Sequence, residues 1–267
     1  MKKKFLFKFI LLALVGLPFG FSSHAAETVK LYAESSDTFP FAMKDKTGVD
    51  YIVLNLIEKK LGIKFEYTLV PWERCLATMK SGEADGCFTG SFKKERQEMG
   101  VYPMNGETPD PNKQLHTSSY SLFVPTGKTS SIKVDGMNIS GIAKGGSEKI
   151  GTVLGYSIAD DLTKLGYSVD SQAPSTETNF KKLLAGRLAA VATLTPEGEY
   201  LLSLPQYKDK IAMIPQFLVE KNYYLMLSKQ FVEKHKDLAE KIWSTIPEVR
   251  NSPEYKAAVS KYMAEKK

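Results

Sequence analysis

The sequence predicts an α/β fold, and two observations support that prediction. Of the 267 residues, 43% are hydrophobic and 25% are charged, which is the composition of an ordinary globular protein. Segments with helical spacing alternate along the chain with short apolar segments that are typical of buried strands. Such alternation predicts mainly parallel sheets covered by helices. We find no fixed-period repeat and no low-complexity segment.

The individual elements follow from the spacing of apolar residues and from the residues that end each segment. Gly62 ends one helix, Ser81-Gly82 a second and Ala185-Gly186 a third, because glycine accepts the backbone conformation that closes a helix. The expected strands and extended segments are residues 29–33, 63–70, 84–89, 120–125, 149–154, 188–194, 211–219 and 223–227. The expected helices are residues 51–61, 71–81, 158–165, 180–184, 231–246 and 253–263.

Residues 1–25 have the layout of a secretory signal peptide. A lysine-rich start is followed by an apolar run over residues 9–21 and then by small residues, with Ser23-His24-Ala25 as the best cleavage site. A membrane anchor is the alternative, but the run is interrupted by Pro18 and is shorter than the ~20 residues that a spanning helix needs. We therefore expect cleavage and export to a bacterial periplasm.

The positive charge of the chain lies mainly in that leader. The whole sequence has 36 basic and 30 acidic residues, which gives a formal charge of +6. Without the four leading lysines, 32 basic residues face 30 acidic ones. The remaining lysines are scattered, whereas a nucleic-acid-binding surface needs a dense basic stripe. We therefore expect no nucleic-acid partner.

Cys75 and Cys87 are the only cysteines in the sequence, and export to an oxidising compartment allows a bridge between them. Cys75 lies roughly 9 Å before the end of its expected helix. Cys87 lies roughly 10 Å into the strand that returns alongside that helix. The two sulfur atoms are therefore expected at a similar height on touching elements, which favours a disulfide. Two separate buried thiols are the alternative.

One continuous run, residues 72–96, is more distinctive than a general α/β pattern. It contains a helix, Ser-Gly, Glu-Ala-Asp, a buried strand and the sequence SFKKER. Together with AESSDTFPF at residues 33–41 and IGTVLGYS at residues 150–157, it resembles family 3 of the extracellular solute-binding proteins. These are the polar-amino-acid-type periplasmic binding proteins of ABC transporters. The resemblance implies a type II periplasmic binding protein fold, in which two α/β lobes are joined by two crossover strands and close on a ligand between them.

The resemblance also implies the division of the chain. Lobe 1 is expected at residues 26–122 and 222–267, and lobe 2 at residues 123–221. The crossover strands would lie near residues 120–125 and 217–223. Residues 105–119 are longer than the corresponding family loop, so we expect them to cover the cleft or to contact a partner.

In that family an arginine at the end of the strand and loop clamps the carboxylate of the ligand, and Arg96 occupies its place. A planar guanidinium matches a two-oxygen acceptor. Thr89 and Ser91 match the groups that complete the carboxylate site, although the segment 85–96 is one residue shorter than the usual pattern, which could shift these two assignments by one. A solvated arginine in a charged run is the alternative reading of Arg96.

The other expected ligand contacts come from both lobes. Tyr156 and Ser157 match a lobe 2 loop at a helix N-terminus, where backbone N–H groups and the helix dipole favour an anion. Phe39 and Trp72 match the aromatic walls of the cleft. For Trp72, a position in the helix core is an equally good interpretation.

Leu194 departs from the family pattern, in which an aspartate at this position pairs with the α-ammonium of the ligand. A leucine cannot neutralise an ammonium group, and burying that charge unpaired is costly. Either Glu34, Glu197 or Glu199 substitutes, or the ligand is not a standard α-amino acid.

Catalytic motifs are scarce in the sequence. His116 and His235 lie far apart, in an expected loop and an expected helix, and no metal-binding spacing, GxSxG turn or phosphate-binding loop occurs. We therefore expect a protein that is not an enzyme and has no cofactor or metal. The alternative is an enzyme of the cyclohexadienyl dehydratase type, some of which resemble this family, with Glu34 or Glu197 as the acid.

The sequence thus predicts an exported monomer that binds a small carboxylate-bearing solute and delivers it to an ABC permease in the inner membrane. A sensory protein that presents its ligand to a membrane receptor is a further alternative.

Overall fold

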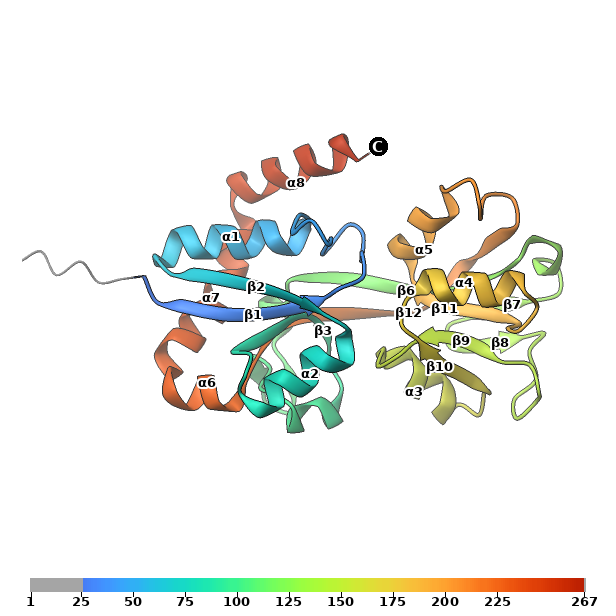
Figure 1. Ribbon diagram of the computed structural model, residues 1–267, viewed down its shortest axis with the longest axis horizontal. Helices are drawn as coiled ribbons and strands as arrows, with labels where there is room; N and C mark the ends of the chain where they lie inside the picture. The colour runs from blue at the N-terminus through green and yellow to red at the C-terminus, as the bar shows by residue number, and fades with distance from the viewer. Residues whose placement is uncertain (1–25, 267) are drawn as a thin grey trace, which may run out of the picture.

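The computed structural model describes residues 26–266, so the expected signal peptide lies outside the described residues. Within them, a mixed α/β fold is built on one sheet of eight strands, in the order β10-β9-β11-β6-β12-β3-β1-β2, with helices around it (Figure 1). The α-helices are α1 (Val49–Leu61), α2 (Trp72–Ser81), α3 (Ser157–Lys164), α4 (Thr176–Leu184), α5 (Thr195–Leu202), α6 (Lys229–Lys234), α7 (Lys236–Asn251) and α8 (Pro253–Glu265). None of them is long and apolar enough to span a membrane.

The strands form two groups at opposite ends of this sheet (Figure 1). At one end, β1 (Thr28–Glu34) runs parallel to both β2 (Lys64–Val70) and β3 (Gly86–Ser91). At the other end, β9 (Ile150–Val153) runs parallel to both β10 (Val169–Ala173) and β11 (Ala190–Leu194). We keep the names lobe 1 and lobe 2 for these two groups and their helices, while their residue bounds stay a prediction.

Two long strands, β6 (His116–Pro125) and β12 (Ile211–Leu227), connect the groups. They pair antiparallel with each other from Ile211 opposite Pro125 to Tyr223 opposite His116. β6 also pairs with β11, and β12 pairs with β3. The expected crossover segments lie inside these two strands, and the two extended segments expected at 211–219 and 223–227 form a single strand.

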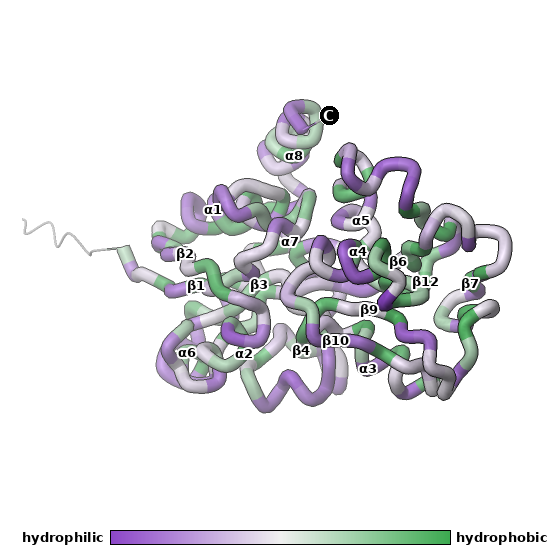
Figure 2. The backbone as a smooth tube through the Cα atoms, turned by 45° about the vertical axis from the view of Figure 1, so that its right-hand side comes forward, coloured by the Kyte–Doolittle hydropathy of each residue, from purple (hydrophilic) through white to green (hydrophobic). Residues whose placement is uncertain are grey.

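Each group has its own apolar core. In lobe 1, α1 and α7 pack on the sheet, and the indole N–H of Trp243 donates a 2.9 Å hydrogen bond to the carbonyl of Leu225. In lobe 2, Phe180 and Leu183 of α4 pack with Phe123 of β6. Hydrophobic and hydrophilic residues alternate along the outer helices α1 and α8 (Figure 2), as expected of helices that bury one face.

A disulfide joins Cys75 of α2 to Cys87 of β3, with 6.2 Å between the Cα atoms. Both residues are fully buried. The preferred interpretation of the two cysteines is therefore confirmed, and the alternative of two separate thiols is wrong.

The structure also contains elements that the sequence pattern did not predict. α5 begins directly after β11, with Pro196 in its first turn, and β10 lies at the sheet edge. The helix expected at 231–246 is divided into α6 and α7, because His235 leaves the helical conformation with φ −128° and ψ 46°. Two small hairpins complete the fold, β4–β5 (Met104–Asn105 and Thr108–Pro109) and β7–β8 (Lys133–Asp135 and Asn138–Ser140).

Candidate functional site

A pocket lies between lobe 1 and lobe 2, beside the connecting strands. It forms where the carboxyl ends of β1 and β3, in lobe 1, face the carboxyl end of β11, which runs in the opposite direction in lobe 2, and α/β sheets bind ligands at the carboxyl ends of their strands. β1 ends at Glu34, β3 at Ser91 and β11 at Leu194. The residues that line the pocket are Glu34, Thr38, Phe41, Trp72, Thr89, Ser91, Arg96, His116, Tyr120, Tyr156, Leu194 and Tyr223.

Six of the eight residues expected to bind ligand line this pocket, namely Glu34, Trp72, Thr89, Ser91, Arg96 and Tyr156. Ser157 lies behind the wall, where its hydroxyl accepts a 2.9 Å hydrogen bond from the hydroxyl of Ser91. Phe39 is displaced, since its ring stacks on Tyr200 with 5.5 Å between centroids. The reason is a tight turn closed by hydrogen bonds from Phe41 and Ala42 to the carbonyl of Thr38, which brings Phe41 to the pocket wall instead.

Arg96 is 5% exposed, so the alternative of a solvated arginine is wrong. It lies in the 3₁₀ helix Lys94–Glu98 that follows β3. Its guanidinium donates hydrogen bonds to the carbonyl of Ser91 at 2.6 Å and to the carbonyl of Gly155 at 2.8 Å. The guanidinium carbon also lies 5.2 Å from the ring centroid of Trp72. Arg96 therefore contacts lobe 1 and lobe 2 at once.

The loop after β9 can approach Arg96 because residue 155 is a glycine. Gly155 has a φ of +76°, which L side chains rarely adopt. A Cβ atom at this position would also collide with the carboxylate of Glu73 on α2. The glycine thus permits the close contact between this loop and α2.

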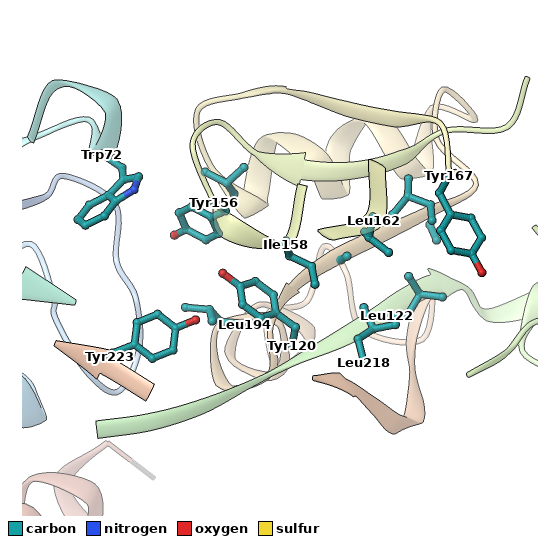
Figure 3. Close-up of a cluster of buried hydrophobic side chains, with 14 of the residues drawn as sticks. Trp72, Tyr120, Leu122, Tyr156, Ile158, Leu162, Tyr167, Leu194, Leu218 and Tyr223 are labelled. Carbon is teal, nitrogen blue, oxygen red and sulfur yellow. The ribbon is translucent and has the colours of Figure 1, made fainter. Parts of the chain in front are cut away.

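Aromatic rings form most of the remaining wall. The hydroxyl groups of Tyr120, Tyr156 and Tyr223 point into a common space beside Leu194, with Trp72 on its far side (Figure 3). Burial raises the pKa of Tyr120 to about 12, and burial also raises the pKa of Tyr156 and of Tyr223 well above its ordinary value. All three are therefore neutral phenols near pH 7, able to donate hydrogen bonds. Trp72 lines the pocket and also belongs to the apolar core, so its contact with a ligand stays a prediction.

His116 is a pocket residue that the sequence reasoning missed, because it was expected in a loop and is the first residue of β6. Its ring lies between those of Phe41 and Tyr223, at centroid distances of 3.6 and 4.7 Å. Its Nδ1 is 2.7 Å from Oδ1 of the fully buried Asp50 on α1. No local motif links positions 50 and 116, but Tyr120 and Tyr223 could have been expected from their place in the crossover segments.

Glu34 and Glu197 are two buried carboxyl groups in this region, 5% and 4% exposed. Burial is the main cause that raises the pKa of Glu34 to about 8, and the charge of Glu197 adds to it. Burial also raises the pKa of Glu197 to about 7, although hydrogen bonds from Thr176 and Thr193 act against this shift. Glu197 lies in α5 and is not part of the pocket wall, and Glu199 is exposed.

Charged side chains join the two lobes beside the pocket. Lys93 forms an ion pair with Asp160 of α3, and Glu95 lies 3.8 Å from Lys164 of the same helix. Lys221 of β12 pairs with Asp161, and its burial lowers its pKa. α3 is therefore held against lobe 1 and the connecting strand by three ion pairs.

Residues 105–119 were expected to cover the cleft or to contact a partner. The structure packs their central part against lobe 1, where Lys113 lies 3.5 Å from Glu240 of α7 and the carbonyl of Gln114 accepts a 3.1 Å hydrogen bond from Arg250. At the end of this stretch, His116 reaches the pocket wall. Over residues 26–266, no group of three or more His, Cys, Asp or Glu side chains is placed to hold a metal ion.

The family model of the bacterial extracellular solute-binding proteins, family 3, matches residues 32–265. The chain belongs to this family. Among solved structures, it is similar to an ancestral arginine-binding protein bound to arginine, with 20% identity and a TM-score of 0.69 over 90% of this chain and 99% of that one. It is also similar to the amino acid ABC transporter substrate-binding protein AbpA from Streptococcus pneumoniae bound to L-arginine, with 19% identity and a TM-score of 0.66 over 88% and 94% of the two chains.

This family member also resembles the ancestral amino acid-binding protein AncCDT-1, a precursor of cyclohexadienyl dehydratase. The identity is 17% and the TM-score is 0.66 over 88% of this chain and 94% of that one. At these identities the likeness establishes the type II periplasmic binding protein fold. A search of curated protein sequences gives no match.

Proposed function

We propose that this protein is a periplasmic solute-binding protein that captures a small carboxylate-bearing solute between lobe 1 and lobe 2. The observation that supports this most directly is a buried arginine, Arg96, on the wall of a pocket that both lobes form. We propose that the monomer delivers its ligand to an ABC importer, with presentation to a membrane receptor as the alternative. The two relatives bound to arginine support a polar amino acid or a related compound as the ligand.

The chemistry of the pocket is suited to a carboxylate. The guanidinium of Arg96 is planar and can offer parallel N–H donors to two oxygens. Thr89 and Ser91 add hydroxyl groups from the end of β3, and Tyr156 adds a phenol from lobe 2. The rings of Phe41 and Trp72 exclude water, which strengthens these polar contacts.

The contacts between the lobes bring both of them to the wall of the pocket, so the ligand would enter and leave when the lobes separate. We propose that β6 and β12 act as the hinge, since they are the strands that connect the two groups of elements. The hydrogen bond between Ser91 and Ser157 and the ion pairs of α3 already join the lobes in this structure, and we propose that they break when the lobes open. Ligand and closure would then stabilise each other.

A thermal-shift screen of residues 26–267 against amino acids, organic acids, amines and short peptides tests this function. A ligand present at 100 times its dissociation constant stabilises the folded state by about 2.7 kcal/mol. For a chain of this size the melting temperature should then rise by roughly 5–10 °C. A ligand-free preparation that responds to no carboxylate in the screen would contradict the proposal.

We predict that Arg96→Ala weakens the carboxylate ligand found in this screen by at least about tenfold, because a hydrogen bond to a charged group is worth roughly 1.5–3 kcal/mol. Isothermal titration calorimetry measures the change. Arg187→Ala is the matched control, since Arg187 is exposed and lies outside the pocket. Equal affinity of wild type and Arg96→Ala would remove Arg96 from the binding site.

A dehydratase of the cyclohexadienyl type is a second candidate, and the environment of Glu34 favours it. A carboxyl group whose pKa is raised to about 8 carries a proton at neutral pH and could give it to a departing hydroxyl group. The similarity to AncCDT-1 adds support. Incubation with prephenate or arogenate tests this, because the aromatic product absorbs in the ultraviolet. Turnover that Glu34→Gln abolishes would establish the enzyme, and its absence leaves binding as the function.

A further inference from the structure

We propose that His116 contacts the ligand directly and selects for a hydroxyl group on it. Nε2 of the imidazole accepts a hydrogen bond from that hydroxyl, and the buried carboxylate of Asp50 holds the ring in the tautomer that makes Nε2 an acceptor. His116 is then a specificity-determining residue and Asp50 a positioning residue. This inference rests on the proposed binding function and adds to it a group that the ligand carries besides its carboxylate.

The ring of His116 is held on both faces. It stacks on Phe41 and Tyr223, at centroid distances of 3.6 and 4.7 Å and interplanar angles of 9° and 8°. Tyr223 lies directly opposite His116 where β6 pairs with β12, so this contact follows from the register of the sheet. The carbonyl of Phe41 accepts a 3.0 Å hydrogen bond from the backbone N–H of Asp50. The ring can therefore make polar contacts only along its edge.

One nitrogen on that edge is already committed to a carboxylate. Nδ1 of His116 lies 2.7 Å from Oδ1 of Asp50, which is fully buried at the start of α1. A carboxylate can only accept, so Nδ1 carries a hydrogen and donates it. Over residues 26–266, Oδ2 of Asp50 has no hydrogen-bond partner, so the carboxylate depends on this contact with His116. Losing the contact would leave a buried charge unpaired, which is costly and therefore fixes the tautomer.

The other ring nitrogen, Nε2, remains for the ligand. His116 lines the pocket, although the residue is only 6% exposed. In the part of the chain that the structure describes, Nε2 makes no hydrogen bond, and it is not one of the unpartnered polar atoms that are sealed from solvent. With both faces covered and Nδ1 occupied, the surface that the ring offers to the pocket is the edge that carries Nε2. A neutral imidazole with its hydrogen on Nδ1 presents a lone pair there.

A hydroxyl group is the ligand group that fits this lone pair. The guanidinium of Arg96 and the neutral phenols of Tyr120 and Tyr156 can donate to a carboxylate, whereas Nε2 needs a donor on the ligand. A neutral ring nitrogen cannot neutralise an ammonium group, and burying that charge unpaired is costly. A hydroxyl group donates a hydrogen bond and carries no charge, so its burial against Nε2 has no such cost.

Matched pairs of carboxylates test the proposal on the wild-type protein. Calorimetry compares serine with alanine, threonine with 2-aminobutyrate, malate with succinate, and tyrosine with phenylalanine. In a pair that binds, we expect the hydroxylated member to bind at least about fivefold more tightly, because the other member leaves Nε2 without a partner.

The outcomes separate this inference from the proposed function. Equal affinity within a binding pair would overturn the inference and leave the proposed function intact. The same conclusion would follow if the tightest carboxylate in the thermal-shift screen carried no hydroxyl group. No response to any carboxylate in that screen would overturn the proposed function, and this inference with it.

The variant His116→Asn, compared with His235→Asn, identifies the residue. Asparagine keeps an N–H group close to the place of Nδ1 but has no atom in the place of Nε2. We expect the two members of a pair to bind His116→Asn within about twofold of each other. His235 is the matched control, because it lies 2.6 Å from a carboxylate oxygen of Glu27 and outside the pocket. A preference that survives in His116→Asn would remove Nε2 from ligand recognition.

Nitrogen NMR gives a readout that needs no change at His116. From residue 26 onward the sequence contains only two histidines, so the spectrum of His235→Asn reports on His116 alone. Near pH 7 we expect a hydrogen on Nδ1 and an unprotonated Nε2, whose signal shifts on binding the hydroxylated ligand and not on binding its deoxy analogue. A hydrogen on Nε2 in the ligand-free protein would contradict the proposal even if His116→Asn failed to fold.

The variant Asp50→Asn tests the positioning role. Asparagine has the shape of aspartate, but its amide can donate to Nδ1 and then favours the tautomer with hydrogen on Nε2. We expect the Nδ1–H signal to weaken and the preference for the hydroxylated ligand to fall. Asp135→Asn is the control, because Asp135 is exposed on β7. An unchanged tautomer and preference in Asp50→Asn would show that Asp50 does not position His116.

Discussion

Glu34 and Glu197 are buried acids whose pKa values lie near 8 and 7, well above their ordinary value of 4.5. The folded protein therefore holds protons that the unfolded chain has already released as the pH rises above 4.5. Stability from such groups is complete below the unfolded pKa and is lost as the pH rises through the folded pKa. The two acids thus make the empty protein less stable in mildly alkaline solution.

We predict that Glu34→Gln reduces the loss of stability that the protein suffers as the pH rises. Between about pH 6 and pH 9, the melting temperature of the wild type should fall by more than that of the variant. Glu66→Gln provides the control, since Glu66 is exposed on β2. Parallel curves for all three proteins would show that Glu34 is not protonated in the folded state.

Gly155 gives a second prediction at the residue scale. Gly155→Ala and Gly186→Ala both place a side chain at positive φ, +76° and +70°, which costs roughly 1–2 kcal/mol of stability. Only at position 155 would the added Cβ meet neighbours, the mobile carboxylate of Glu73 and, at 3.1 Å, the ring of Trp72 on the pocket wall, whereas position 186 is open. Gly155→Ala should therefore also weaken ligand binding, by calorimetry, and Gly186→Ala should not. Equal effects of the two variants on affinity would contradict this.

At the residue scale, a position at the pocket was predictable where it follows from the end of a nearby strand, while contact with a ligand stays a prediction. Thr89 and Ser91 reach the pocket at the end of β3, and Tyr156 reaches it from the loop after β9. The prediction was wrong for Phe39 because the turn at 38–42 brings Phe41 to the pocket wall in its place. His116 was missed because its partner Asp50 is distant in sequence. Neither the turn nor the pairing with Asp50 has a local signal.

At the scale of elements, the disulfide fastens α2 to β3, two elements that each contribute residues to the pocket wall. It closes a loop with a sequence separation of 12 residues. A bridge of this kind reduces the freedom of the unfolded chain and stabilises the fold by about 2–4 kcal/mol. Since Trp72 begins α2 and Ser91 ends β3, the bridge also fixes two parts of the pocket wall relative to each other.

We predict that replacing Cys75 and Cys87 with alanine lowers the free energy of unfolding by about 2–4 kcal/mol, as measured by urea denaturation. A reductant should lower the free energy of unfolding of the wild type by a similar amount and should leave that of the double variant unchanged. A wild type whose unfolding curve does not respond to reductant under denaturing conditions would contradict a stabilising bridge.

The elements themselves were largely predictable, because apolar spacing and terminating glycines are local properties. α1, α2 and β2 begin and end within two residues of the expected positions. α5 was missed because Thr195-Pro196 starts a helix immediately after β11, with no intervening loop to separate the two patterns. β12 was divided in two because its middle, around Glu220, is polar and only partly buried.

At the scale of the whole molecule, the two lobes contact each other at the pocket wall, through Arg96 and Ser91, and also through the ion pairs of α3. Lys93 pairs with Asp160, and Glu95 lies 3.8 Å from Lys164. Such pairs act over a Debye length of about 8 Å at physiological salt, so they favour closure without a ligand and weaken at high salt. The balance between open and closed molecules should therefore depend on these charges.

We predict that Lys93→Glu shifts the ligand-free protein toward an open form. Small-angle X-ray scattering should give a radius of gyration a few per cent above the roughly 18 Å of a compact chain of this length. Saturating ligand should restore the smaller value. Lys181→Glu is the control, because Lys181 pairs with Glu177 within α4, away from the pocket. An unchanged radius in Lys93→Glu would show that these pairs do not control closure.

The sheet order β6-β12-β3-β1 has a consequence for how the protein is made. β3 ends at Ser91, yet its neighbour β12 begins only at Ile211. During synthesis or passage through a membrane, the edge of β3 therefore stays unpaired until more than a hundred further residues have emerged. Unpaired strand edges promote aggregation. Strands β9, β10 and β11 of lobe 2, in contrast, lie within that interval and can pair earlier, so lobe 1 is the part whose sheet stays incomplete until β12 has been made.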